Sequence, residues 1–295
     1  MCMQQHLVLV TSLNNRHTKR ATILATTSVE KMVRLLALLC LTVASSAGSR
    51  DEYQRLDPAC SSEIYCHGPM LHAIQMARLY NDSKTFVDKK LRHRPELVLQ
   101  EFHQLPELVS KEELQRFVDA HFDAEGSEFE SWHPTDWVQD PQFLAGIADA
   151  QLRRWGRALH SDWKFLGRQI KEDVAVHPEL YSMIYVANPF IVPGGRFREF
   201  YYWDSYWIVK GLLVSEMHQT VKGMLENFIH MVDVYGLVPN GGRVYYEQRS
   251  QPPMLTPMVD AYVTATDDIQ FLQDNIHLLE KELQVFLFHF LFFFF

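Results

Sequence analysis

Residues 193–207, PGGRFREFYYWDSYW, form the segment of this sequence best suited to bind a polar ligand. Trp203 offers a flat apolar face for a sugar ring, and the Asp204 carboxylate can accept hydrogen bonds from two neighbouring hydroxyls. Arg196 adds a planar set of donors. This combination suits a neutral polyol better than an apolar ligand. Residue type alone favours a simpler interpretation, in which the aromatic side chains pack in the core and the charges form a solvated or paired surface.

Residues 236–253 hold a second group of polar side chains. Asn240, Ser250 and Gln251 can each donate and accept a hydrogen bond, as a sugar hydroxyl requires, and Arg249 adds a fixed fork of donors. The stretch 239–242, PNGG, also fits a simple tight turn. By themselves these residues are weak evidence for a site.

Together, the two segments resemble the trehalase family. The resemblance covers about residues 51–282, and the sequence resembles the secreted animal enzymes most. The matching motifs are GPMLHAIQMARLYNDSKTFVD, ANPFIVPGG, PGGRFREFYYWDSYW, VPNGGRVYY, RSQPP and PMVDAYVTAT. It implies an all-α fold, the (α/α)6 toroid, with an active site at its mouth built from loops between helix pairs. It implies trehalose as the small-molecule substrate and a substrate-binding set of Arg196, Trp203, Asp204, Asn240, Arg249, Ser250 and Gln251. Arg198 and Glu199 also match, and we interpret them as a structural ion pair.

Hydrolysis of trehalose to glucose by an inverting glycosidase needs two separated carboxyl groups. The resemblance places the acid in a downstream Gly-Trp-Asp motif and the base further on, and neither that motif nor the family's Gln-Trp-Asp signature occurs here. We therefore expect no catalytic residues in this chain, an incomplete toroid that folds poorly, and no detectable trehalase activity. The alternative is a non-catalytic trehalose-binding fragment. A different α/α-toroid glycosidase is disfavoured because the matching motif is long.

Residues 32–47, MVRLLALLCLTVASSA, have the composition of a signal peptide cleaved after Ala47. A buried helix is the alternative, but the run has no polar face. We interpret residues 1–31 as a gene-model extension ahead of a true start at Met32, and residues 48–282 as the N-terminal part of a trehalase catalytic domain. The protein is therefore expected to be secreted, and a membrane-anchored form of the full-length protein stays open.

The phenylalanine-rich residues 283–295 show no polar helical face and are too short to span a bilayer. We interpret them as aberrant sequence, with a membrane-associating tail as the alternative.

Cys60 and Cys66 can form one small disulfide loop in an oxidising compartment, or remain two thiols. Asn81-Asp82-Ser83 is a glycosylation sequon.

The net charge of −8 becomes −12 over residues 48–295, because five basic residues and one acidic residue precede residue 48. An acidic body repels phosphate backbones, so a nucleic acid is not an expected partner. The histidines are scattered without ligand spacing, and no metal or cofactor is expected.

Hydrophobic periodicity predicts a mostly helical domain. Helices are expected after Gly68-Pro69, from a capping box at Ser110, from Asp140-Pro141 through Leu159, over residues 206–217, over residues 219–235 up to Gly236, and after a cap at Thr266-Asp267-Asp268. The two short strand candidates are residues 183–186 and 243–246.

Overall fold

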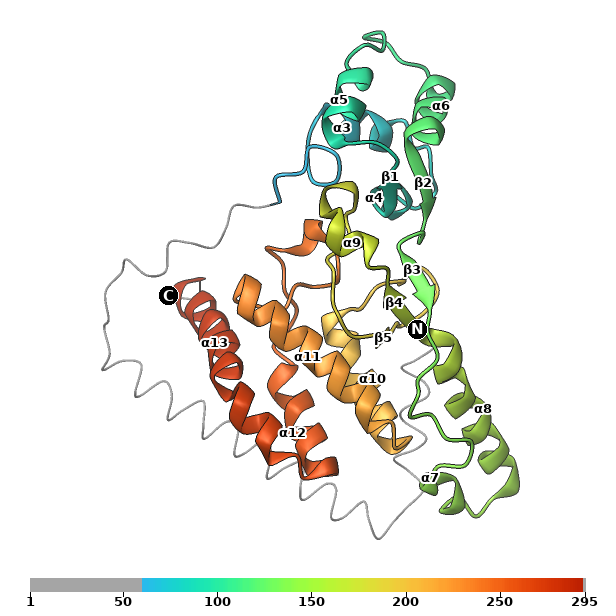
Figure 1. Cartoon of the computed structure of the whole chain (residues 1–295), viewed down its shortest axis with the longest axis vertical. Helices are drawn as coiled ribbons and strands as arrows, with labels where there is room; N and C mark the ends of the chain where they lie inside the picture. The colour runs from blue at the N-terminus through green and yellow to red at the C-terminus, as the bar shows by residue number, and fades with distance from the viewer. Residues whose placement is uncertain (1–59, 294–295) are drawn as a thin grey trace. The chain divides into compact units, whose positions relative to one another are not determined.

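The computed structural model describes residues 60–293, coloured from blue to red in Figure 1. Predictions that concern residues 1–59, including the signal peptide, the gene-model extension and the cleavage after Ala47, lie outside the described residues. In chain order the elements are α3 Pro69–Met76, α4 Lys84–Val87, β1 Lys89–Leu91, α5 Pro95–Phe102, α6 Lys111–His121, β2 Phe122–Glu125, β3 Phe129–Ser131, α7 Gln142–Ala145, α8 Ala150–Leu166, β4 Gly167–Ile170, α9 Asp173–Val176, the 3-10 turn η1 Pro178–Leu180, β5 Phe190–Ile191, α10 Tyr202–Val214, α11 His218–Tyr235, the 3-10 turn η2 Val244–Tyr246, α12 Leu255–Thr266 and α13 Ile269–Phe293.

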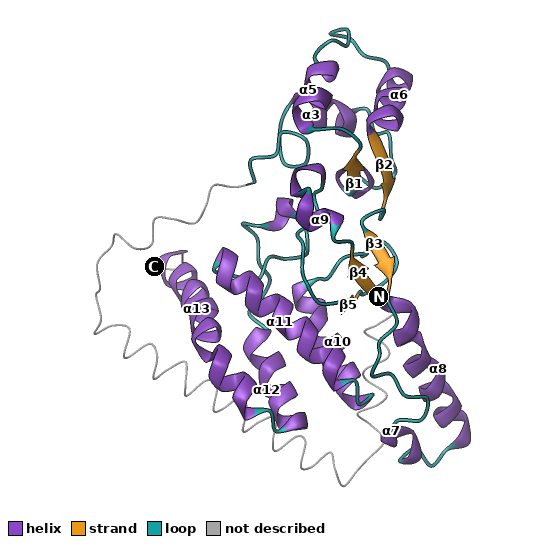
Figure 2. Cartoon of the chain, in the orientation of Figure 1, coloured by secondary structure: helices purple, strands orange, loops and turns teal. Residues whose placement is uncertain are grey.

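Helices α10 to α13 pack together around the larger hydrophobic core, and α11 contacts each of the other three (Figure 1). Short connections join α10 to α11 and α12 to α13, so the four helices form two helical hairpins. The prediction of an all-α fold is confirmed, since helices dominate Figure 2 and the strands are short. Pairs of this kind are the repeating unit that the (α/α)6 toroid requires.

A second, smaller core lies under α3 to α6 and includes Phe86, Leu91 and Phe122. Leu180 and Val244 pack against both cores. Strand β1 pairs with β2, and β4 pairs with β3 on one side and β5 on the other, all antiparallel. The described part of the chain therefore has two apolar centres joined by shared residues.

Local sequence patterns located several helix ends. Ser110 accepts the Glu113 amide at 3.2 Å while the Glu113 carboxylate accepts the Ser110 amide at 2.9 Å, which is the predicted capping box. Gly236 ends α11 at φ 77°, a left-handed conformation that favours glycine. The Asp268 carboxylate accepts the Phe271 amide at the start of α13. Helix α13 then continues to Phe293, so the backbone of most of the predicted aberrant tail is helical.

Three local predictions were wrong. The single helix expected from Asp140 is two, because Asp149 accepts the amides of Gln151 and Leu152 and so starts α8 after the short α7. Helix α10 begins at Tyr202, four residues before the predicted start. The two strand candidates form only an isolated bridge between Met183 and Arg243, and the second one continues as a 3-10 turn.

Within residues 60–293, no helix combines the length and apolar character needed to cross a membrane. The α10–α13 layer nevertheless carries large apolar side chains at its surface: Trp207, Val214, Val234, Ile269 and Ile276.

The buried carboxyl group of Glu282 is expected to make the stability of these helices depend on pH. Glu282 is 1% exposed, and its carboxyl group accepts a hydrogen bond from the Tyr202 hydroxyl. The same hydroxyl accepts hydrogen bonds from the amides of Met254 and Leu255, each at 2.8 Å. Burial raises the pKa of Glu282 to about 7, against the opposing effect of the Tyr202 hydrogen bond. The folded chain thus keeps a proton that the unfolded chain loses near its ordinary pKa of 4.5.

Stability is therefore expected to fall as pH rises from 5 to 7, by about 1–2 kcal/mol, and to level off above the folded pKa. Urea unfolding at a series of pH values measures this slope. Glu282→Gln keeps an acceptor for Tyr202 and removes the titration, so it should flatten that part of the profile. An unchanged slope in the variant would assign the pH dependence to another group.

Candidate functional site

The N-terminus of α10 forms the centre of the candidate site. Its first amides have no partner within the helix, and the Gln251 side-chain oxygen accepts the Trp203 amide at 2.7 Å. Gln251 thereby satisfies one amide in the first turn of α10, the turn that carries Trp203 and Asp204. The Trp203 and Trp207 rings meet edge to face with centroids 6.5 Å apart, and Trp203 is half-buried.

Backbone hydrogen bonds place residues 238–251 against the same helix end. The Tyr202 amide donates to the Asn240 carbonyl at 3.2 Å, and the Asn240 amide donates to the Arg249 carbonyl at 2.6 Å. Gly241 forms a bridge with Tyr201, and a Cβ there would lie 3.1 Å from the Tyr201 ring. Glycine at this position therefore permits the close contact that brings Asn240 to the site.

Ser250 has a partly structural role. Its hydroxyl donates to the Val238 carbonyl at 2.7 Å, which closes the loop on itself. The Ser250 oxygen keeps acceptor capacity for a ligand, but its proton is engaged. Arg249, by contrast, is exposed, and within the described residues no side-chain partner of its guanidinium is found. Of the two, Arg249 is the more available donor.

Asp204 lies in the first turn of α10 and is half-buried. Burial raises the pKa of its carboxyl group, while a hydrogen bond from its own amide lowers it. No other residue between 60 and 293 is seen to donate to this carboxylate, unlike Asp82 or Glu199, whose oxygens are occupied. A partly desolvated carboxylate that, among the described residues, accepts only from its own amide keeps the capacity to accept hydroxyl protons from a ligand.

Arg196 lies on the turn before α10 and reaches the other residues through aromatic contacts. Its guanidinium lies over the Phe197 ring, which contacts Tyr201 edge to face. Tyr201 in turn contacts Tyr246, whose carbonyl accepts the Arg249 amide at 2.8 Å. The structure thus brings six predicted residues to one helix end and links Arg196 to them through this aromatic series.

A buried charge cluster, which sequence analysis did not identify, supports the turn and the loop. It consists of Lys84, Asp88, Glu128, Glu199 and Arg243, and Glu199 is 0% exposed. Lys84 Nζ lies 2.5 Å from Asp88 and 2.8 Å from Glu199, while Arg243 Nη2 lies 2.6 Å from Glu128. Its members come from four distant segments, so no local pattern in the sequence could have found it.

The predicted pairing of Arg198 with Glu199 was wrong. Arg198 Nη2 lies 2.6 Å from Glu125, whereas Glu199 contacts Lys84 and accepts the Tyr201 hydroxyl proton at 2.6 Å. The two neighbouring side chains therefore take different directions: Glu199 enters the buried cluster, and Arg198 remains partly exposed. Burial, with Glu199 as the next cause, raises the pKa of Tyr201 and keeps its hydroxyl protonated.

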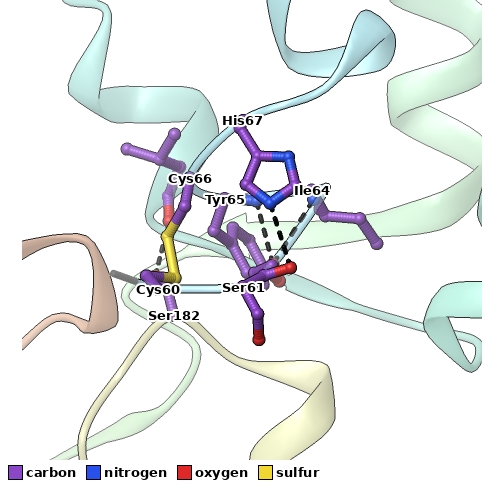
Figure 3. Close-up of a disulfide and its surroundings, with 9 residues drawn as sticks. Cys60, Ser61, Ile64, Tyr65, Cys66, His67 and Ser182 are labelled. Atoms are coloured by element: carbon purple, nitrogen blue, oxygen red, sulfur yellow. Dashed lines mark hydrogen bonds between the residues drawn. A yellow bond between two sulfur atoms is a disulfide. The ribbon is translucent and has the colours of Figure 1, made fainter. Parts of the chain in front are cut away.

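Two further predicted residues lie near the start of the described chain. Cys60 and Cys66 form a disulfide, shown in Figure 3 beside Tyr65. The Tyr65 hydroxyl lies 2.8 and 2.9 Å from the carbonyl oxygens of Lys89 and Leu180, which ties the loop to both cores. Asn81 is exposed, as a glycosylation acceptor must be. Within the described range, no three or more His, Cys, Asp or Glu side chains are arranged so that they could hold a metal ion.

Comparison with known proteins identifies the family. The trehalase family model matches residues 78–289, which include all seven predicted substrate-binding residues. The chain belongs to the trehalase family. Human trehalase is 55% identical over 249 residues, which cover 83% of this chain and 42% of the human protein. Trehalase of the honeybee Apis mellifera is 57% identical over 227 residues, 76% of this chain and 36% of that protein.

More distant trehalases also match. The Arabidopsis thaliana protein is 36% identical over 211 residues, which cover 68% of this chain and 33% of that entire protein. The chain spans about two fifths or less of the length of these three relatives. The predicted family is therefore confirmed, and the similarity concerns one part of the trehalase sequence.

Proposed function

We propose that this chain carries one side of a trehalose-binding site, and that the whole protein hydrolyses trehalose to glucose as an inverting glycosidase. The observation that supports this most directly is the gathering of Trp203, Asp204, Asn240 and Gln251 at the N-terminus of α10. An aromatic face, a carboxylate with no side-chain donor among residues 60–293 and two side-chain amides match the needs of a sugar ring with several hydroxyls. Arg196 and Arg249 add donors at the edge.

The same geometry argues against hydrolysis by these residues alone. Inverting hydrolysis needs two carboxyl groups placed about 6.5–9.5 Å apart on either side of the scissile bond. Asp204 is the one predicted site carboxylate, and Glu199 is buried and engaged by Lys84 and Tyr201. We therefore propose that Asp204 binds substrate and that the acid and base belong to other parts of the protein.

The experiment measures trehalose binding and glucose release with the same purified 295-residue chain, after circular dichroism has shown that it is folded. We expect saturable binding in calorimetry and no glucose in a coupled oxidase assay. Maltose, with the same composition and a different glycosidic linkage, is the control ligand. Glucose release that Asp204→Ala abolishes would contradict the assignment, as would a folded chain that binds neither sugar.

We further propose that the protein is secreted and glycosylated at Asn81. The Cys60–Cys66 disulfide supports an oxidising compartment, and the exposure of Asn81 supports modification. Expression in animal cells tests both points. We expect the protein in the medium, with a mass that falls on treatment with an N-glycosidase and does not fall in Asn81→Gln. Retention in the cytosol without that mass change would contradict them.

A further inference from the structure

The Arg196 side chain lies on an exposed turn that does not by itself fix its direction. Gly194 and Gly195 have φ of 98° and 63°, and the Phe197 amide closes the turn on the Gly194 carbonyl at 3.2 Å. The Arg196 side chain is 54% exposed. A long side chain in such a place loses rotamer entropy when it is ordered.

Asp82, 114 residues earlier, holds this guanidinium with both carboxylate oxygens. Arg196 Nε donates to Asp82 Oδ2 at 2.5 Å, and Nη2 donates to Oδ1 at 2.7 Å. This bidentate geometry fixes the plane of the guanidinium as well as its position. The pair lowers the pKa of Asp82, so the carboxylate stays charged. Arg196 Nη1 has no partner among the described residues and can donate to a ligand.

Asp82 is itself fixed from the interior. Its Oδ1 also accepts the Lys84 amide at 3.0 Å, and Lys84 Nζ lies 2.8 Å from Glu199 in the buried cluster. Glu199 is three residues from Arg196 on the same segment. Two ion pairs thus join the α4 segment to the Arg196 turn, one at the surface and one buried.

The surface pair adds little to stability, because water weakens the attraction between exposed charges and holding two long side chains together costs entropy. The buried Lys84–Glu199 pair already holds the two segments together. Because Asp82 is not needed to hold the segments together, its main effect is to fix the direction of the Arg196 side chain. We infer that Asp82 is a positioning residue, which holds the Arg196 guanidinium ready to donate to a sugar ligand; the ligand part of this inference rests on the proposed function.

Chemical modification tests the contact without any ligand. Phenylglyoxal reacts with accessible arginines, and peptide mass mapping measures the rate at each position. We expect Asp82→Asn to raise the rate at Arg196 several-fold and to leave the rate at Arg249 unchanged as an internal control. The substitution also preserves the glycosylation sequon. Equal rates at Arg196 in the two proteins would overturn the inference.

Trehalose affinity tests the consequence. Ordering one long side chain is worth about 0.5–1.5 kcal/mol, so Asp82→Asn should weaken trehalose binding about 2- to 10-fold. In a chain that already carries Arg196→Met, adding Asp82→Asn should cause no further loss of affinity. If the losses of the two substitutions add, Asp82 acts independently of Arg196. Asp82→Glu, which keeps the charge, should recover part of the affinity. A wild-type chain that does not bind trehalose contradicts the proposed function, and the modification rates still decide the role of Asp82.

Discussion

Arg243→Met is expected to lower the free energy of unfolding by about 3–5 kcal/mol, the usual result of removing one partner from a buried ion pair. The Arg243 guanidinium is 1% exposed and lies 2.6 Å from Glu128, 3.6 Å from Asp88 and 3.7 Å from Glu199. Burial alone lowers its pKa, but the three carboxylates outweigh burial and raise it, so Arg243 stays charged.

The loss is large because the remaining charges do not balance. Without Arg243, Lys84 would be the one cation of the cluster facing three buried carboxylates. Methionine has a similar volume, so the change tests charge and hydrogen bonding rather than a cavity. A loss on this scale is a large part of the 5–15 kcal/mol that stabilises an ordinary domain.

Urea unfolding followed by circular dichroism measures the effect. Arg243→Lys keeps a charge without the planar fork and should cost less than methionine. Arg157→Met is the matched control. Arg157, on α8, forms an exposed ion pair with Asp140, so this substitution should change stability by about 1 kcal/mol at most. If Arg243→Met costs no more than that control, the cluster does not hold the fold.

The parts of the structure that the sequence predicts correctly depend on neighbouring residues. The Ser110 capping box and the left-handed Gly236 are decided within four or five residues, and both occur as predicted. The helix expected from Asp140 was wrong for a related reason. Asp149 is an equally good cap nine residues later, and periodicity alone cannot choose between one helix and two.

The contacts that position the site are long-range and leave no local pattern. Asp82 and Arg196 are 114 residues apart, and the buried cluster joins residues from position 84 to position 243. Resemblance to a family supplied the site residues, but it could not tell that Glu199 is directed into the interior while Arg198 is bound to Glu125. Those roles follow from packing, which only the structure shows.

This arrangement separates the groups that hold the site from those available to a ligand. Buried charges pair with one another, Lys84 with Glu199 and Arg243 with Glu128, and so join the turn before α10 to the loop after α11. Asp204 and Arg249, at the ends of those elements, have no side-chain partners within residues 60–293. A ligand would thus meet a helix end and a loop whose backbone is already in place, which reduces the entropy lost on binding, while the exposed Arg249 side chain would still have to be ordered.

Asp204→Ala is expected to weaken trehalose binding about 10- to 100-fold, because hydrogen bonds to a charged group contribute about 1.5–3 kcal/mol. Asp204→Asn keeps one acceptor oxygen and loses the charge, so its affinity should lie between those of wild type and alanine. Calorimetric titration with trehalose gives the dissociation constants. Asp162→Asn, an exposed aspartate on α8, removes the same charge away from the predicted site residues and should leave the affinity unchanged.

The pH dependence of binding separates Asp204 from a purely structural role. Burial raises the pKa of Asp204 above its ordinary value of 3.8, and the ionised form is the stronger acceptor. Trehalose affinity should therefore be full at neutral pH and fall as pH drops through this raised pKa. Asp204→Asn cannot titrate, so its affinity should stay flat over the same range. If the trehalose affinity of Asp204→Asn still falls at low pH, another group accepts the sugar hydroxyls. Asp204 would then have a structural role at the helix end and would not contact the ligand.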